Sequence, residues 1–286
     1  MKSIALRLAS VGLVVGAVSL ALPAQARASE LDCTSGCSLQ PLAFGETLGG
    51  TAYVSTTSVG STGTGVLDPF VRLQQNGSES GHNTSGAFLN DEKAGTWTHD
   101  LRLNELPLSI IDGVAYYEFL LDADENNSTA GQLLALNNVQ ICVGATGGLV
   151  GPTAGSGNNI HEISCPGTLK YAFGAFGSGA NEVMMDYDFT GSGSGKADLF
   201  MYIPVATLGA PSGQYVYLFS QFGLAVPAGR GDTDAGFEEW AILPCYPNCG
   251  VYVDPHSTVP EPSSLLLLGA GVLGLAAVVR RRSARA

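Results

Sequence analysis

Residues 215–219 read Tyr215-Val216-Tyr217-Leu218-Phe219, a run of large apolar and aromatic side chains. In an extended chain successive side chains point to opposite faces. This run would therefore place three aromatic rings on one face and two aliphatic side chains on the other. Alternation of large side chains between two faces is typical of a strand that lies between core and solvent. The stretch predicts a β-strand, and it sets the fold class that the rest of the chain repeats.

Seven other segments are similarly rich in β-branched and aromatic residues, with Gly, Ser, Asn and Pro in the intervals. No segment of the body keeps the 3.6-residue period of a capped helix beyond a few turns. The predicted strands are residues 66–73, 96–103, 114–121, 139–143, 169–176, 183–189, 199–205 and 215–222. Eight such strands predict an all-β fold, a single antiparallel β-sandwich or jelly roll over residues 29–257.

The body of the chain is strongly acidic. Between Glu30 and Glu261 lie 25 acidic and six basic side chains, a formal net charge of −19, and the other basic residues belong to the two ends. Nucleic-acid binding depends on Lys and Arg contacts with phosphates. This balance therefore argues against nucleic acid as a partner.

The N-terminal segment has the three parts of a secretory signal. Lys2 and Arg7 supply the positive start, residues 8–22 the apolar run, and residues 23–28 the small-residue exit. Residues 1–28 are therefore predicted to be a signal peptide that signal peptidase removes before Ser29.

The C-terminal segment has three parts in a fixed order. A short Val259-Pro260-Glu261-Pro262 motif precedes an uncharged apolar run over residues 263–279, which is long enough for a short transmembrane helix. A basic tail follows at residues 280–286, and basic residues behind an apolar span favour the cytoplasmic side. The tail contains Arg280, Arg281, Arg282 and Arg285.

This order resembles the PEP-CTERM sorting signal, which is also catalogued as the C-terminal domain of ice-binding proteins. The resemblance covers residues 258–283 and includes all three parts. It implies handling by an exosortase in a Gram-negative bacterium that makes exopolysaccharide. The chain would then be held briefly in the inner membrane before it reaches the cell surface. A permanent tail anchor is the alternative.

Six cysteines lie in the predicted body, as expected for a protein oxidised after export. The simplest pairing is local, and a zinc site is the alternative for the two terminal pairs. The predicted disulfides are Cys33–Cys37, Cys142–Cys165 and Cys245–Cys249.

Two acidic loops have the alternating oxygen ligands that can wrap a Ca²⁺ ion. Neither matches an EF-hand loop, and solvated acidic turns are the alternative for both. One candidate set is Asp122, Asp124 and Asn126, and the other is Asp232, Asp234 and Glu238. Calcium is the one cofactor that the sequence suggests.

The body also resembles an uncharacterised set of exported PEP-CTERM proteins, in residues 67–72, 118–122, 193–198 and 236–240. That resemblance implies a single exported β domain and carries no activity.

Three function classes remain. The first is a non-enzymatic surface or matrix protein associated with exopolysaccharide. The second is a carbohydrate-binding or adhesive module, for which exposed aromatic side chains such as Trp97 or Trp240 would be needed. The third is a secreted glycoside hydrolase, which needs a carboxyl pair; the candidates are Glu118, Glu238 and Glu239.

Overall fold

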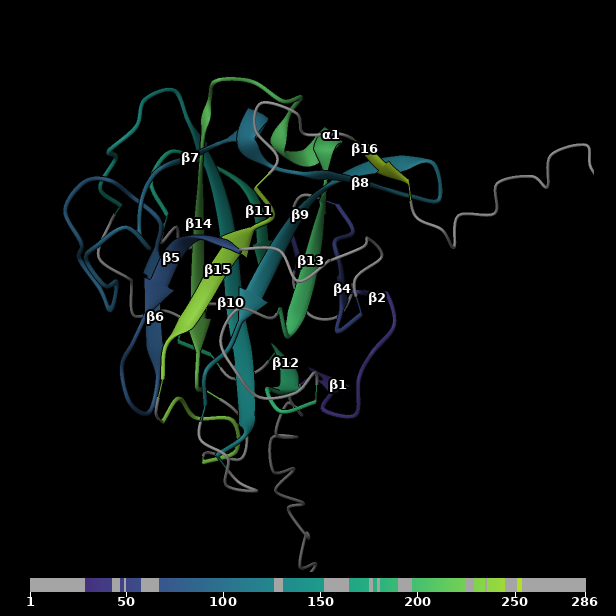
Figure 1. The fold of residues 1–286 in the computed structure, drawn as a ribbon, viewed down its shortest axis with the longest axis vertical. Helices are drawn as coiled ribbons and strands as arrows, with labels where there is room; N and C mark the ends of the chain where they lie inside the picture. The colour runs from purple at the N-terminus through teal and green to yellow at the C-terminus, as the bar shows by residue number, and fades with distance from the viewer. Residues whose placement is uncertain are drawn as a thin grey trace, which may run out of the picture.

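The computed structural model describes twelve stretches of the chain, which together form two β-sheets with almost no helix (Figure 1). These stretches are residues 29–42, 47–48, 50–57, 67–125, 131–151, 165–174, 177–178, 181–189, 197–224, 229–234, 236–244 and 251–253. The all-β class predicted from the sequence is confirmed. The predicted signal peptide at 1–28 and the predicted sorting segment at 258–283 lie outside this part.

The first sheet is built around β10 (Leu133–Gly144), the longest strand described. One side of β10 pairs with β14 (Tyr215–Phe222), and β12 and β11 share its other side. Beyond β14 lie the short strands β6 and β7, and beyond β12 and β11 lie β1 and β3. Their bounds are β1 Ser29–Cys33, β3 Thr47–Leu48, β6 Glu79–His82, β7 Leu101–Arg102, β11 Thr168–Phe173 and β12 Asn181–Asp186.

The second sheet is built around β9 (Val114–Asp122). β13 pairs with one side of β9, while β8 and β15 share the other. The remaining strands extend the sheet outward from β13, β15 and β8. Their bounds are β2 Gln40–Pro41, β4 Tyr53–Ser55, β5 Asp68–Leu73, β8 Leu108–Ile111, β13 Leu199–Pro204, β15 Glu238–Ile242 and β16 Val251–Val253. The short helices are η1 (Leu103–Glu105) and α1 (Val205–Leu208).

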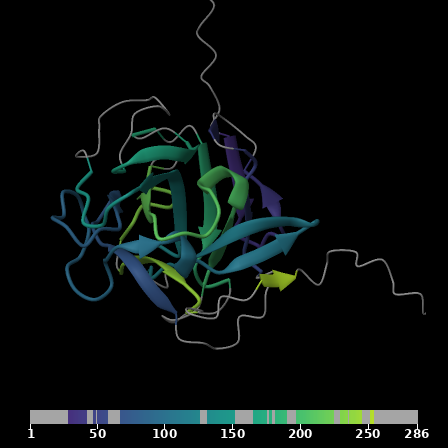
Figure 2. The same ribbon diagram turned by 90° about the horizontal axis from the view of Figure 1, so that it is seen from above.

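Both sheets contribute to one hydrophobic core. Leu218 and Ile141 of the first sheet are buried in the same cluster as Phe119 and Trp240 of the second. The two sheets are also joined by a hydrogen bond, because Trp240 Nε1 donates to Ser220 Oγ at 3.0 Å. Figure 2 shows the strands of the two sheets from above. Burial of these large apolar side chains contributes most of the stability of the fold. The alternation of large side chains in the sequence predicts this burial.

The strand predictions need three corrections. Two pairings are parallel, β1 with β12 and β16 with β8, whereas an antiparallel fold was predicted. β10 begins six residues before the predicted segment at 139–143, and only residues 101–102 of the segment 96–103 form a strand. Several further strands were not predicted: β8, β15, the short strands β1, β2, β3, β4 and β16, and the polar strand β6, none of whose four residues carries the apolar signal of a strand.

Two of the three predicted disulfides are confirmed. Cys33 pairs with Cys37 and Cys142 with Cys165, with Cα–Cα separations of 4.9 and 5.8 Å. The second links β10 to the segment that leads into β11. The third predicted pair, Cys245–Cys249, falls outside the residues that the structure describes.

Candidate functional site

The two predicted calcium loops lie side by side. The backbone N–H of Asp234 donates to Glu125 Oε2 at 3.1 Å, which joins the turn before β15 to the end of β9. Gly236 packs against the chain at Asp124, just after β9, because a Cβ atom at position 236 would be only 1.8 Å from the carbonyl oxygen of Asp124. The sequence alone predicts two separate calcium sites in these loops.

The calcium hypothesis stays a prediction. Within the described part of the chain, no group of three or more His, Cys, Asp and Glu side chains could hold a metal ion. Asp232 Oδ1 accepts the N–H of Gly229 at 3.1 Å, Glu238 is buried in β15, and Asn126 falls outside the described residues.

Three buried carboxyl groups meet where the two sheets adjoin, and we call them the interior carboxyl cluster: Glu79, Glu125 and Glu238. Glu79 begins β6 in the first sheet, Glu238 begins β15 in the second, and Glu125 follows β9. The carboxyl of Glu238 is within hydrogen-bonding reach of both others. The segments are tied together by Gly77, whose N–H donates to Thr233 O at 2.7 Å, and by Thr233 Oγ1, which donates to Gln75 O at 2.6 Å.

This cluster has few hydrogen-bond donors. One oxygen of Glu79 accepts the N–H of Gln75 at 2.8 Å, and one oxygen of Glu125 accepts that of Asp234. The second oxygen of Glu79 and of Glu125 is buried and accepts no such bond. A buried carboxylate without donors is costly, so the neutral form is favoured.

The pKa values of the cluster follow from this environment. Burial raises the pKa of Glu79 to about 7, although the N–H of Gln75 and the charge of Lys93 oppose the shift and Asp91 adds to it. Burial and the neighbouring Asp234 raise the pKa of Glu125 to about 8. Burial, followed by the proximity of Glu79, raises the pKa of Glu238 well above its usual value.

Glu92 is a buried carboxyl outside this cluster, and it is surrounded by hydrogen-bond donors. The N–H groups of His82 and Asn90 donate to its two oxygens at 3.1 and 2.7 Å, and His82 Nδ1 lies 3.2 Å from Oε1. Burial alone would raise the pKa of Glu92, but these contacts outweigh it and lower the pKa to about 2. Sequence reasoning missed His82, Glu92 and Glu79, which occur in a polar stretch with no periodic signal.

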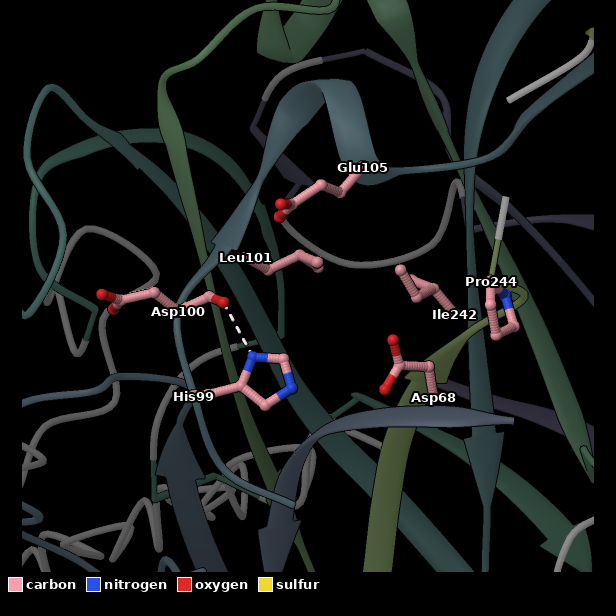
Figure 3. A pocket seen from close by; sticks show the side chains of 7 residues that line it. All are labelled: Asp68, His99, Asp100, Leu101, Glu105, Ile242 and Pro244. Carbon is pink, nitrogen blue, oxygen red and sulfur yellow. Dashed lines mark hydrogen bonds between the residues drawn. The ribbon is translucent and has the colours of Figure 1, made fainter. Parts of the chain in front are cut away.

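A cavity of about 300 Å³ opens at the other end of β5 and β15, and we call it the acidic pocket. Asp68 and Ile242 are cross-strand partners at the ends of these strands. The remaining walls come from the segment around β7 and η1 and from Pro244 (Figure 3). The lining residues are Asp68, His99, Asp100, Leu101, Glu105, Ile242 and Pro244.

Most of the pocket's polar groups already have backbone partners. Asp100 accepts the N–H groups of Ser85 and Gly148 at 3.0 and 2.7 Å, and its carboxylate points away from Asp68 and Glu105 in Figure 3. The ring nitrogens of His99 lie 2.8 and 3.1 Å from the carbonyl oxygens of Asp100 and Pro69. Glu105 accepts the N–H of Arg102 at 2.8 Å.

The residues considered for hydrolysis or sugar binding occupy separate places. Glu118 is buried and accepts the hydroxyl of Ser109 at 2.5 Å, and burial raises its pKa. Glu239 is paired with Arg72. None of the three candidate carboxyls lines the acidic pocket. Trp240 is fully buried and therefore belongs to the core, whereas Trp97 is 41% exposed.

The exposed ring of Trp97 stacks on a cation. The guanidinium of Arg72 lies 4.0 Å from the centroid of Trp97 and 3.8 Å from that of Phe237. The same guanidinium is hydrogen-bonded to Glu239. Cation–π contact with two rings fixes the arginine and holds Trp97 in place at the surface.

Comparison with known proteins gives one match. The family model for the PEP-CTERM protein-sorting motif matches residues 258–282. The chain carries a PEP-CTERM sorting motif. This motif covers the Pro260-Glu261-Pro262 sequence and most of the segment predicted to follow it, and it implies exosortase processing and export to the cell surface.

The PEP-CTERM motif occupies less than a tenth of the chain. No curated protein and no solved structure matches this sequence. Among the residues that the structure describes, no helix is sufficiently long and apolar to cross a membrane. The predicted span at 263–279 lies outside those residues, so that prediction stays open.

Proposed function

We propose that this protein is a non-enzymatic surface or matrix protein of a Gram-negative bacterium. Signal peptidase removes residues 1–28, and the apolar segment 263–279 holds the chain briefly in the inner membrane. Exosortase then cleaves near Pro260-Glu261-Pro262 and delivers the two-sheet β domain to an exopolysaccharide layer. The observation that carries this proposal is the matched PEP-CTERM motif.

The chemistry of the acidic pocket supports the non-enzymatic part of the proposal. General acid–base catalysis needs a carboxyl or imidazole that is available to the substrate. Here the ring nitrogens of His99 face carbonyl oxygens, both oxygens of Asp100 accept backbone bonds, and Glu105 accepts the N–H of Arg102. These contacts are structural, and among the described residues they leave the exposed Asp68 as the pocket carboxylate without a hydrogen-bond partner.

Intact-mass measurement of the exported protein tests the proposal. In an exosortase-positive host the exported form is expected to lack residues 263–286, and in an exosortase-deleted host it is expected to keep them. A variant with alanine at Pro260, Glu261 and Pro262 should also keep them, while the neighbouring Ser263→Ala control should be processed normally. Arginines still attached to the wild-type exported protein would contradict the proposal.

A carbohydrate-binding module is the second candidate, and the exposed ring of Trp97 favours it. Aromatic rings held rigidly at a surface present a flat apolar face at low entropic cost. A glycan array with the wild-type chain and Trp97→Ala separates the two candidates. Binding that disappears in Trp97→Ala would favour the module.

A further inference from the structure

β16 is the last strand that the structure describes before the sorting motif. It pairs in parallel with β8, with Val251 beside Leu108 and Val253 beside Ile110. β16 ends at Val253, and the PEP-CTERM match begins at residue 258. The folded body and the sorting motif are therefore joined through β16 by a short stretch of chain.

The pairing of β16 limits how far the motif can reach from the body. From Val253 to Pro260 the chain has seven Cα–Cα steps, which span at most about 25 Å in any conformation. A domain of about 230 residues has a radius of gyration of about 17 Å and a width of about 45 Å. The body therefore crowds an enzyme that binds the motif while β16 is paired.

Release of β16 at least doubles this reach. The preceding strand is β15, which ends at Ile242. From Ile242 to Pro260 the chain has 18 steps, a reach of at most about 60 Å, or about 50 Å with the predicted Cys245–Cys249 bridge. Both values exceed the width of the domain. A tethered group meets its target only if the tether spans the gap, and the released form satisfies this condition.

β16 has the features of a strand that opens by itself. It has three residues, its one described partner strand is β8, and parallel pairing is slightly less stable per residue than antiparallel pairing. In Figure 1 it lies beside β8 at the margin of the second sheet. When β16 leaves, β8 keeps its antiparallel register with β9. Short terminal elements of this kind open at a low cost in free energy and leave the rest folded.

We propose that β16 is a strap that controls exosortase processing: paired with β8 it holds the motif against the body, and its release lets the enzyme bind the motif. The proposal rests on the proposed function in one respect, which is that an exosortase cleaves near Pro260-Glu261-Pro262. It adds the regulation of that cleavage by the fold of the exported domain.

Pulse–chase labelling of the full chain in an exosortase-positive host tests the strap through the rate at which residues 263–286 are lost. Ile110→Cys with Val253→Cys locks β16 to β8, because register partners in adjacent strands lie about 4.8 Å apart, within the range of a disulfide. Ile110 is only partly buried, so its replacement spares the core. We expect the locked chain to be processed at least about tenfold more slowly than wild type, and each single Cys variant at the wild-type rate.

A longer tether should bypass the strap. About ten Gly and Ser residues inserted between His256 and Ser257 bring the reach of the locked chain close to that of the released form. We expect this insertion to restore processing of the locked chain and to speed processing of the otherwise wild-type chain. A locked chain that had misfolded would not be rescued in this way.

An opened strap gives the opposite variant. Val251→Pro with Tyr252→Pro removes two consecutive backbone donors, one of which faces β8, and so disrupts the pairing. We expect processing at the wild-type rate or faster. Slower processing would mean that β16 positions the motif for the enzyme, and it would overturn the proposal.

The proposal is also overturned if the locked chain is processed at the wild-type rate, or if the insertion fails to speed both the locked and the unlocked chain. Failure of the wild-type chain itself to lose residues 263–286 is a different result. It would contradict the proposed function, of which this regulation is a refinement.

Discussion

Glu92 and the carboxyls of the interior carboxyl cluster are all buried, yet their pKa values shift in opposite directions. Glu92 accepts N–H groups from His82 and Asn90, and its anion is stabilised. Glu238 is surrounded mainly by other carboxyl groups, and its anion is destabilised. Burial penalises the charge in both places. The difference shows that the number of donors aimed at a buried carboxyl determines which form the folded protein holds.

Removal of Glu92, the buried carboxyl that accepts several hydrogen bonds, should have the largest effect on stability. Glu92→Ala leaves the buried His82 ring without its partner and orphans the N–H groups that Glu92 accepts. We expect the free energy of unfolding to fall by about 3–5 kcal/mol, because each buried donor left without its acceptor costs about 1–3 kcal/mol. Urea unfolding of the full chain at pH 7 measures it. The control is Asp112→Asn in an exposed turn, because Asn tolerates the positive φ of 50° at this position. An equally small loss in both variants would remove the contrast between the two regions.

The pH dependence of stability should be the next largest effect. The pKa of the cluster is raised on folding, so the folded state holds protons that the unfolded chain releases. This contribution is complete below about pH 4.5 and is lost as the pH rises toward 8. We expect the free energy of unfolding to fall by on the order of 3 kcal/mol across that window.

Glu92 should give the opposite trend at lower pH. Its pKa is lowered on folding, so its contribution is present above about pH 4.5 and is lost as the pH falls toward 2. Urea unfolding across the range from pH 3 to 8.5 measures both limbs. Glu238→Gln should flatten the limb above pH 4.5, because the amide keeps a donor but does not titrate, while Glu92→Gln should flatten the acidic limb. Identical profiles for the two variants would contradict the assignment.

A smaller effect is expected from crowding the donor-rich site. A Cβ atom at Gly81 would be 2.6 Å from Leu73 Cδ2 and 2.8 Å from Glu92 Cγ. Gly81→Ala should displace Glu92 from its donors and cost about 1–3 kcal/mol. The matched control is Gly213→Ala, where nothing lies within 4 Å of the added atom, and we expect a change below about 1 kcal/mol. Thermal unfolding compares the two, and equal shifts would mean that the position of Glu92 matters little.

Strands that consist of large apolar side chains are predictable from the sequence, and strands interrupted by or built from polar residues are not. β14 and β9 follow the alternation or density of large side chains, and they were predicted within one residue. β10 was predicted too short because Asn137 and Asn138 interrupt the apolar pattern. Their side chains bond the backbone around them, with Asn138 Nδ2 donating to Gly174 O at 2.7 Å. Such pairing depends on tertiary neighbours and leaves no periodic signal.

The candidate sites show the same division. The sorting motif is local in sequence and was found there, and Glu238 was singled out from its acidic loop. Its neighbour Glu79 is 159 positions earlier in the chain, in an all-polar strand that no pattern marks as buried. The acidic pocket likewise unites Asp68 with Ile242 across a strand pair. Contacts of that kind arise from strand order, which the sequence alone does not fix.

Infrared spectroscopy of the folded full chain tests most directly whether the interior cluster holds protons. At pH 6 an ordinary carboxyl group is ionised, so the carbonyl band of un-ionised carboxylic acid reports groups with raised pKa values. We predict that this band is present in the wild-type protein, is reduced in Glu238→Gln and is unchanged in Glu92→Gln. A wild-type spectrum without the band at pH 6 would contradict the account.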